Sequence, residues 1–163
     1  MLGVDPGKTG AVALLVDGRL VGAADMPVAG KIVSGHLLYQ TVRGLLRHPL
    51  APVVPAAYAA VIEDVHAMHS QGVTSMFSFG RSLGVVEGVL AGNGWPVHYV
   101  ATTRWKKALG LSSDKGASRR RACEMWPDMA HLFARVKDDG RAEAALIGLW
   151  WSQANTRTVE VAP

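Results

Sequence analysis

The chain has 163 residues and 49% apolar composition, which is typical of one globular domain, and we expect a single domain over residues 1–163. No apolar run approaches the roughly 18 residues that a membrane span needs, which argues against a membrane protein. Residues 1–5 also lack the basic and then apolar pattern of a signal peptide. Cys123 is the single cysteine, so the chain cannot form an intrachain disulfide, and we expect a reducing, cytoplasmic location.

The net charge of +4 is unevenly distributed along the sequence. Residues 104–121 contain seven basic residues and one acid, Asp114, so the rest of the chain is close to neutral or slightly acidic. The basic residues are Arg104, Lys106, Lys107, Lys115, Arg119, Arg120 and Arg121. Such a concentrated segment is typical of proteins that bind the phosphate backbone of nucleic acids. Charge alone leaves a solvated helix face as the alternative.

The N-terminal part of the chain predicts three strands and a helix. Asp17-Gly18 is a strong hairpin signal between two apolar runs, which indicates an antiparallel meander. The expected strands are residues 2–5, 11–16 and 19–26. Apolar residues at helical spacing predict a helix over residues 33–46, and the three prolines of residues 48–55 predict a linker.

The second part alternates strands and helices. We expect a buried strand over residues 57–65, a long helix over 73–90 and a short strand over 96–100. Further helices are predicted from Thr102 or Thr103 to 108, over 118–126, and from Asp138 or Asp139 to about 154. Strands followed by strand–helix alternation indicate an α/β domain with a mixed sheet.

Four carboxylates stand where a catalytic site would need them. Asp5 ends an apolar strand before a Pro-Gly turn, Glu63 lies near the end of the strand AYAAVIEDV, and Asp139 and Glu143 are one helical turn apart. Strand ends and a helix start can converge at one edge of a sheet. Clustered carboxylate oxygens favour Mg²⁺ or Mn²⁺, and two such ions would catalyse phosphodiester hydrolysis.

Each acid also has a purely structural interpretation. Asp5 could cap the Pro-Gly turn, and Glu143 could face solvent, whereas a lone buried Glu63 would be costly. Asp138 and Asp139 compete for the N-cap of the last helix. Positions five apart differ by about 140° around a helix and positions four apart by about 40°, so Asp139 can act together with Glu143, and Asp138 is expected to be the cap.

These motifs together resemble the RuvC family of Holliday junction resolvases. The similarity rests on GVDPG at residues 3–7, the acid Glu63 and the AEAAL segment at 142–146, and covers about residues 2–153. The segment 71–84, Trp105-Lys106-Lys107 and residues 139–144 are similar to the phage and organellar branch; a phage protein would act in the host cytoplasm. The resemblance implies an RNase H-like fold, with three antiparallel and then two parallel strands flanked by helices. It also implies a homodimer that resolves four-way junctions by two-metal hydrolysis with paired symmetric nicks.

The resemblance assigns roles to individual acids. Asp5 would be the bridging metal ligand, Glu63 the second ligand and Glu143 the last acid. Many members have an acid or histidine three residues before that last acid, but this chain has Gly140 there. We therefore expect Asp139 to be the fourth ligand, with two Mg²⁺ ions, replaceable by Mn²⁺, in each site.

The resemblance also implies residues that contact DNA. Lys115 matches a basic residue near the scissile phosphate, although an exposed loop lysine is an equal alternative. The loop 66–72 would approach the junction crossover, so His66 and Gln71 are candidates, with a surface loop as the alternative for His66. The basic candidates are Arg104, Lys106, Lys107, Lys115, Arg119 and Arg120. Trp105 and the tryptophans of the later helices are expected to fill the core or a dimer face.

Three other functions stay open from sequence. A nuclease of the same fold could cut branched DNA in general or RNA–DNA hybrids. A junction-binding protein could have lost catalysis, but the retained acids argue against this. An actin-like or sugar-kinase-like ATPase shares the core and a loop like residues 5–10, but it needs a second lobe and a second phosphate loop, neither of which is found in this sequence.

Overall fold

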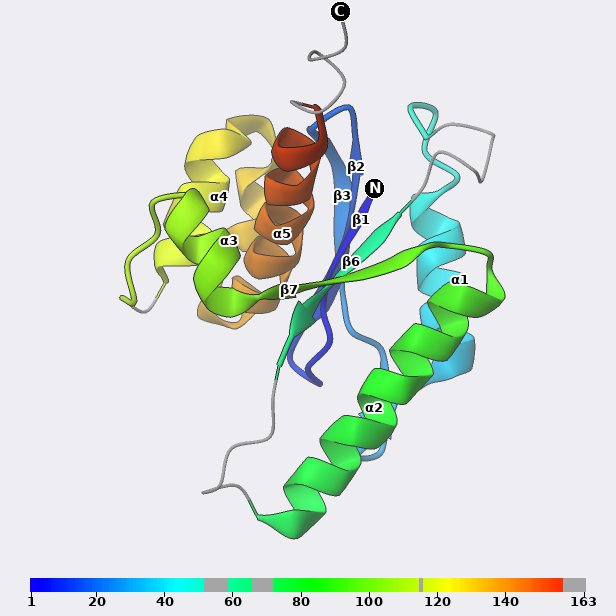
Figure 1. The fold of residues 1–163 in the computed structure, drawn as a ribbon. Helices are drawn as coiled ribbons and strands as arrows, with labels where there is room; N and C mark the ends of the chain where they lie inside the picture. The colour runs from blue at the N-terminus through cyan, green and yellow to red at the C-terminus, as the bar shows by residue number, and fades with distance from the viewer. Residues whose placement is uncertain (52–58, 66–71, 115, 157–163) are drawn as a thin grey trace, which may run out of the picture.

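A computed structural model describes residues 1–51, 59–65, 72–114 and 116–156. Its main feature is a five-stranded sheet in the order β3-β2-β1-β6-β7 (Figure 1). The strands β1, β2 and β3 are antiparallel neighbours, whereas β6 runs parallel to β1 and β7 parallel to β6. The strands are β1 (Leu2–Asp5), β2 (Ala11–Val16), β3 (Arg19–Asp25), β6 (Ala60–Asp64) and β7 (Val97–Ala101). The predicted mixed sheet of three antiparallel and two parallel strands is confirmed.

Helices cover both faces of this sheet (Figure 1). On one face lie α1 (Gly35–Leu45) and α2 (Val73–Gly92). On the other lie α3 (Thr102–Ala108), α4 (Ala117–Met125) and α5 (Asp139–Thr156). No helix within these ranges combines the length and hydropathy needed to cross a membrane.

Side-chain alternation along the strands decides which residues reach the α5 face. Leu2 and Val4 of β1 belong to the core under α1 and α2. Because successive side chains of a strand point to opposite faces, Gly3 and Asp5 face α5. The same alternation in β6 sends Ile62 to the α2 side and Glu63 to the α5 side. Asp5 and Glu63 therefore share one face at adjoining strand ends.

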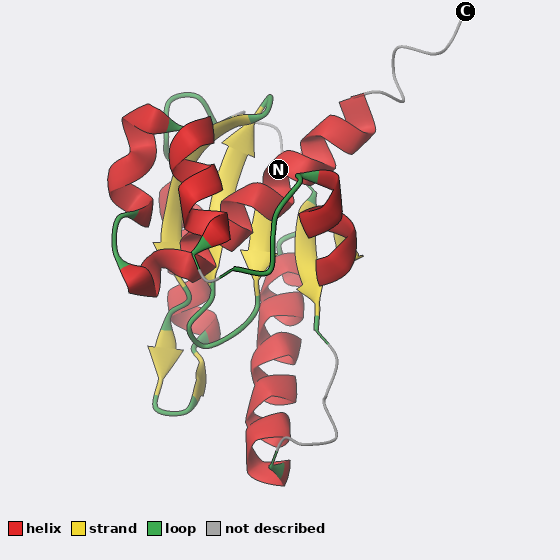
Figure 2. Ribbon diagram, turned by 90° about the vertical axis from the view of Figure 1, so that its left-hand side faces the viewer, coloured by secondary structure: helices red, strands yellow, loops and turns green. Residues whose placement is uncertain are grey.

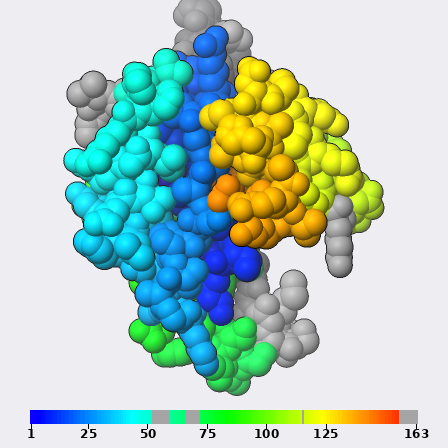
Figure 3. Space-filling view, turned by 180° about the vertical axis from the view of Figure 1, so that it is seen from behind, coloured from blue at the N-terminus to red at the C-terminus, as the bar shows by residue number. Residues whose placement is uncertain are grey.

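Glycines let α5 approach the sheet backbone closely. A methyl group on Gly3 would overlap the carbonyl oxygen of Ala144, and one on Gly148 would lie 2.5 Å from the Leu15 side chain. The N-terminal end of α5 is equally tight, since a methyl group on Gly140 would lie 2.5 Å from the carbonyl oxygen of Thr9. Figure 3 shows this part of the chain, in orange, beside the blue N-terminal strands.

The structure differs from the predicted elements in a few places. A small hairpin, β4 (Val28–Ala29) and β5 (Ile32–Val33), precedes α1 and projects beyond the sheet (Figure 2). Consequently α1 begins at Gly35, after the N-cap Ser34, and not at residue 33. Two 3-10 helices, η2 (Pro127–Phe133) and η3 (Val136–Asp138), connect α4 to α5 and were not predicted. The expected strand 57–65 is β6, and residues 57–58 lie outside the described residues.

Candidate active site

Asp5 lies at the end of β1, where the chain turns back over it. Its Oδ1 accepts a hydrogen bond from the Gly7 backbone N–H at 3.2 Å. A methyl group on Gly10 would overlap the Asp5 backbone, so the second glycine of the turn lets the chain close over the acid. The pKa of Asp5 is raised to about 7, mainly by burial and also by the charges of Glu63 and Glu143, whereas the Gly7 N–H and Lys106 act in the lowering direction.

Glu63 is a buried acid on the neighbouring strand, with 6% of its surface exposed. Trp105 of α3 is fully buried and donates its indole N–H to Oε1 of Glu63 at 3.0 Å. Since Val4 pairs with Ile62 in the parallel β1–β6 ladder, Asp5 and Glu63 follow at the same level. Their electrostatic coupling reflects this placement.

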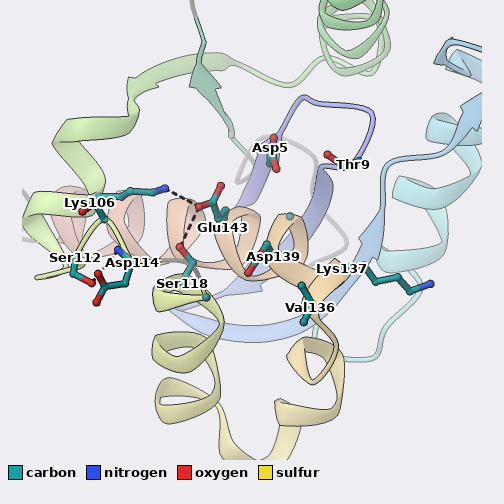
Figure 4. A pocket seen from close by; sticks show the side chains of 13 residues that line it. Asp5, Thr9, Lys106, Ser112, Asp114, Ser118, Val136, Lys137, Asp139 and Glu143 are labelled. Carbon is teal, nitrogen blue, oxygen red and sulfur yellow. Dashed lines mark hydrogen bonds and ion pairs between the residues drawn. The ribbon is translucent and has the colours of Figure 1, made fainter.

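Glu143 approaches the same place from the first turns of α5. Its Oε1 accepts hydrogen bonds from Lys106 Nζ at 2.7 Å and from Ser118 Oγ at 3.1 Å (Figure 4). The Lys106–Glu143 ion pair is partly buried. Three elements, α3, α4 and α5, therefore meet at this carboxylate.

The two neighbouring aspartates have different surroundings. Asp139 forms an ion pair with Arg119 of α4, Nε to Oδ1 at 2.7 Å, and its side chain is half exposed. Asp138 is fully buried and binds back to Arg135, accepting from its backbone N–H at 2.8 Å and from its guanidinium. These bonds lower the pKa of Asp138. The prediction that Asp138 caps the last helix is therefore wrong. Its carboxylate accepts a hydrogen bond at the start of the preceding η3 turn and not from the backbone of α5.

A pocket of about 420 Å³ lies between the end of β1 and the start of α5. Asp5, Asp139 and Glu143 line it, together with Lys106, Lys137 and serines from the α3–α4 region (Figure 4). Gly140 also lines it and is pressed against the β1–β2 turn, which leaves no room for a larger side chain at that position. Asp139, which precedes Gly140, lines the same pocket as Glu143.

The donor set fits a hard divalent cation in its chemistry. Burial, and to a smaller extent repulsion from the carboxylates of Glu63 and Glu143, raises the pKa of Asp5, and a cation would relieve that repulsion. In the conformation described, however, Lys106 and Ser118 hold Glu143. No three acids, histidines or cysteines of the described residues converge closely enough to enclose an ion. A cation at these acids would therefore compete with Lys106 for Glu143.

The basic candidates are divided between the pocket and its surroundings. Lys106 and Arg119 face the pocket acids. Arg104 packs its guanidinium 5.5 Å from the Trp150 ring centre, and Lys107 and Arg120 are exposed on α3 and α4. His66, Gln71 and Lys115 lie outside the described residues, although Asp114 and Gly116, on either side of Lys115, line the pocket.

Several polar residues at the site were not proposed from the sequence. Ser118, Lys137 and Thr9 line the pocket, and Ser118 binds Glu143 directly. Thr9 belongs to the turn after Asp5, so its proximity followed from the motif. Ser118 and Lys137 carry no comparable signal, because their position depends on how α4 and η3 pack against α5.

Comparison with solved structures identifies the fold. Thermus thermophilus RuvC in complex with a Holliday junction substrate superimposes with a TM-score of 0.66, at 19% identity, over 96% of this chain and 95% of that chain. A second Thermus thermophilus RuvC structure gives a TM-score of 0.61 at 18% identity, over 96% of both chains. The chain has the RuvC fold. The expected RNase H-like architecture is therefore confirmed.

The chain is also similar in sequence to a Holliday junction resolvase. The chloroplastic Holliday junction resolvase MOC1 of Chlamydomonas reinhardtii is 29% identical over 146 residues, which cover 77% of this chain. The match spans 17% of the algal protein's length. No protein-family model matches the chain. The resemblance to RuvC-type resolvases that the motifs indicated thus extends to both sequence and fold.

Proposed function

We propose that this protein is a crossover junction endodeoxyribonuclease that resolves four-way DNA junctions. The observation that carries the proposal is the pocket that joins Asp5, Asp139 and Glu143 on a RuvC fold, with Glu63 buried beside it. The similarity to a chloroplastic Holliday junction resolvase supports the same substrate. Residues 1–163 would form one nuclease domain.

The acids would hold Mg²⁺ or Mn²⁺, two ions in each site. Asp5, Glu63, Asp139 and Glu143 are the proposed ligands. The bound cations would activate water and stabilise the leaving oxygen of the scissile phosphodiester. Lys106, whose Nζ lies 2.7 Å from Glu143 in the pocket, would bind a phosphate oxygen of the DNA. Arg119 would orient Asp139 from α4, a role supported by their 2.7 Å contact.

The basic residues would bind the DNA backbone around this pocket. Lys107 and Arg120 are exposed on α3 and α4, and Arg104, also on α3, packs against the Trp150 ring. Lys115, His66 and Gln71 stay candidates for contacts near the scissile phosphate and the crossover. Phosphate contacts of this kind supply binding energy but little sequence preference.

We further propose a homodimer with paired symmetric nicks. Gly80, Gly84, Gly88 and Gly92 repeat every four residues along the exposed side of α2, and a methyl group on any of them would meet nothing within 4 Å. Phe77 and Val73 extend this surface, with 67% and 79% of their area exposed. A second copy could approach this glycine face closely. A phage or organellar origin and a reducing, cytoplasmic location stay proposals, the latter supported by the free Cys123.

A substrate panel tests the proposed function. The purified protein is incubated with a labelled mobile four-way junction, a linear duplex and an RNA–DNA hybrid, each with Mg²⁺, Mn²⁺ or EDTA. We expect paired nicks in the junction with either metal, leaving 5′-phosphate and 3′-hydroxyl ends, and no cleavage in EDTA. Cleavage of the hybrid in preference to the junction would instead support a ribonuclease, and equal cutting of flaps and forks a general branched-DNA nuclease.

A further inference from the structure

The hydrogen bond between Trp105 and Glu63 links two elements whose residues are 42 positions apart in sequence. Trp105 has no exposed surface and Glu63 has 6%. From the sequence, Trp105 was expected only to fill the core or a dimer face. Its indole N–H nevertheless meets a carboxylate that the proposed function uses to bind a cation.

The topology of the sheet produces this contact. Strands β6 and β7 are parallel, with Glu63 opposite Val100 and Asp64 opposite Ala101. Both strands therefore end at the same edge. Helix α3 begins at Thr102, immediately after β7, so its first turn lies beside the end of β6. Trp105 reaches Glu63 from this turn while its ring packs in the α5-side core.

The chemistry of the pair goes beyond filling the core. A buried indole N–H needs an acceptor, and a backbone carbonyl would satisfy it. Here the acceptor is Oε1 of Glu63, and this is the one hydrogen bond found for that carboxylate within the described part of the chain. The bond limits the rotation of the side chain and leaves the other oxygen as the one presented to a cation.

Trp105 also differs from its neighbour Lys106. Lys106 pairs its positive charge with Glu143, so a cation would compete with Lys106 for that acid. The indole is neutral and contacts only Oε1 of Glu63, so its hydrogen bond is compatible with a cation on the other oxygen. Two consecutive residues of α3 thus hold two acids, and Trp105 does so without a charge that competes with the cation.

We propose that Trp105 is a positioning residue that orients Glu63 for divalent cation binding. This inference rests on the proposed function for the role of Glu63. Partners that orient a metal ligand through a hydrogen bond typically contribute about 10–100-fold to metal affinity. The indole N–H of Trp105 should therefore matter to the cation even though it never touches it.

The test is a Mn²⁺ titration of the DNA-free protein, read from the electron paramagnetic resonance signal of free Mn²⁺. Trp105→Phe keeps an aromatic ring and removes the N–H. We expect Mn²⁺ to bind about 10–100-fold more weakly than to the wild type, with the half-saturating Mn²⁺ concentration for cleavage raised in parallel. Trp126→Phe is the matched control, because Trp126 packs against the same core and donates to no carboxylate among the described residues. It should bind Mn²⁺ as the wild type does.

Combining Trp105→Phe with Glu63→Gln shows whether Trp105 acts through Glu63. We expect Trp105→Phe to have little further effect on Mn²⁺ affinity in that background. Wild-type affinity in Trp105→Phe, equal weakening in Trp126→Phe, or an undiminished effect beside Glu63→Gln would each overturn the proposal. A wild type that binds Mn²⁺ but cuts no junction would refute the proposed function and leave the positioning role intact.

A measurement without substitution of Trp105 covers the case in which the variant does not fold. The five indole N–H resonances of the ¹⁵N-labelled protein are followed by nuclear magnetic resonance during a Mg²⁺ titration. We expect one resonance to shift with Mg²⁺ and also to be displaced in Glu63→Gln. If no indole resonance responds to both changes, the proposal is wrong.

Discussion

At the scale of single residues, Asp5 shows how the fold changes the chemistry of an acid. In the unfolded chain its pKa would be the usual 3.8, whereas burial in the folded protein raises it to about 7. The nearby charges of Glu63 and Glu143 act in the same direction. A cation would supply the positive charge that this group of acids lacks.

The pKa of Asp5 predicts how stability depends on pH without metal. Because the folded state binds this proton more tightly, the free energy of unfolding falls as the pH rises from about 4 to about 7, by about 2–4 kcal/mol. Asp5→Asn should therefore melt above the wild type at about pH 8 in EDTA and close to it near pH 4. Addition of Mg²⁺ should reduce this difference in melting temperature at about pH 8, because Mg²⁺ stabilises the wild type. The same melting temperature for both proteins at both pH values would contradict this.

Substitution of the candidate acids should abolish DNA cleavage without abolishing DNA binding. Asp5→Asn, Glu63→Gln and Glu143→Gln are each expected to abolish junction cleavage, because each removes a charged oxygen ligand. Junction affinity in a gel-shift assay should stay within a few-fold of the wild type, since basic residues supply that energy. Parallel loss of binding and cleavage in all three variants would refute this division.

The adjacent aspartates should give opposite phenotypes. Asp139→Asn is expected to lose cleavage in Mg²⁺ and keep its melting temperature, because Asp139 lines the pocket and is half exposed. Asp138→Asn should lose several degrees in melting temperature and retain cleavage, because Asp138 is buried and bound to Arg135. An inactive Asp138→Asn beside a normal Asp139→Asn would reverse the assignment of the fourth ligand.

At the scale of elements, the position of α5 controls the site. This helix carries Asp139 and Glu143, and its glycines set its distance from β1 and from the turn that follows Asp5. Helix α3 adds Trp105 and Lys106, and α4 adds Ser118 and Arg119. The pocket is thus held by helix packing as well as by the strand ends.

Gly140 tests this dependence. A methyl group there would lie 2.5 Å from the Thr9 carbonyl oxygen and 2.8 Å from the Gly10 Cα, so Gly140→Ala must push α5 away from the turn. We expect a loss of about 1–3 kcal/mol in stability and about a 10-fold or larger loss of cleavage. The control is Gly44→Ala on α1, where the methyl group meets nothing within 4 Å. This variant should gain up to about 1 kcal/mol in stability. Chemical denaturation and junction cleavage measure both effects.

At the scale of the whole molecule, we propose catalysis on one face of the sheet and dimer contact on the other. The α5 face carries the pocket, and α2 on the opposite face presents its glycines and Phe77 outward. Two copies joined through α2 would direct two pockets at one junction, which suits a substrate with two-fold symmetry.

Gly84→Arg should separate the two copies. An arginine on the exposed glycine face would block close approach of a second helix, and we expect a shift to the monomer in sedimentation at micromolar concentration. The nicks in a cruciform plasmid should then become unpaired. Gly44→Arg places the same charge on an open position of α1 and should stay dimeric. A wild type that is monomeric in the presence of junction DNA would contradict the proposed dimer.

The sequence by itself determined the strand order along the chain, the mixed sheet and the four candidate acids. These follow from local signals: apolar periodicity, the Asp17-Gly18 turn, and acids at strand ends or a helix start. Helical geometry also favoured Asp139 over Asp138 as the acid that acts with Glu143, and this assignment stays a prediction.

Only the tertiary structure decided which side chains hold those acids. Trp105 and Glu63 are far apart in sequence, as are Ser118 and Glu143, and no local pattern encodes such contacts. The short β4–β5 hairpin and the 3-10 helices were missed for a related reason, since segments of two to seven residues carry little periodic signal. The binding of Asp138 back to Arg135 likewise depended on an unpredicted turn. Contacts between distant segments arise from the packing of whole elements, and that packing exists only in the folded molecule.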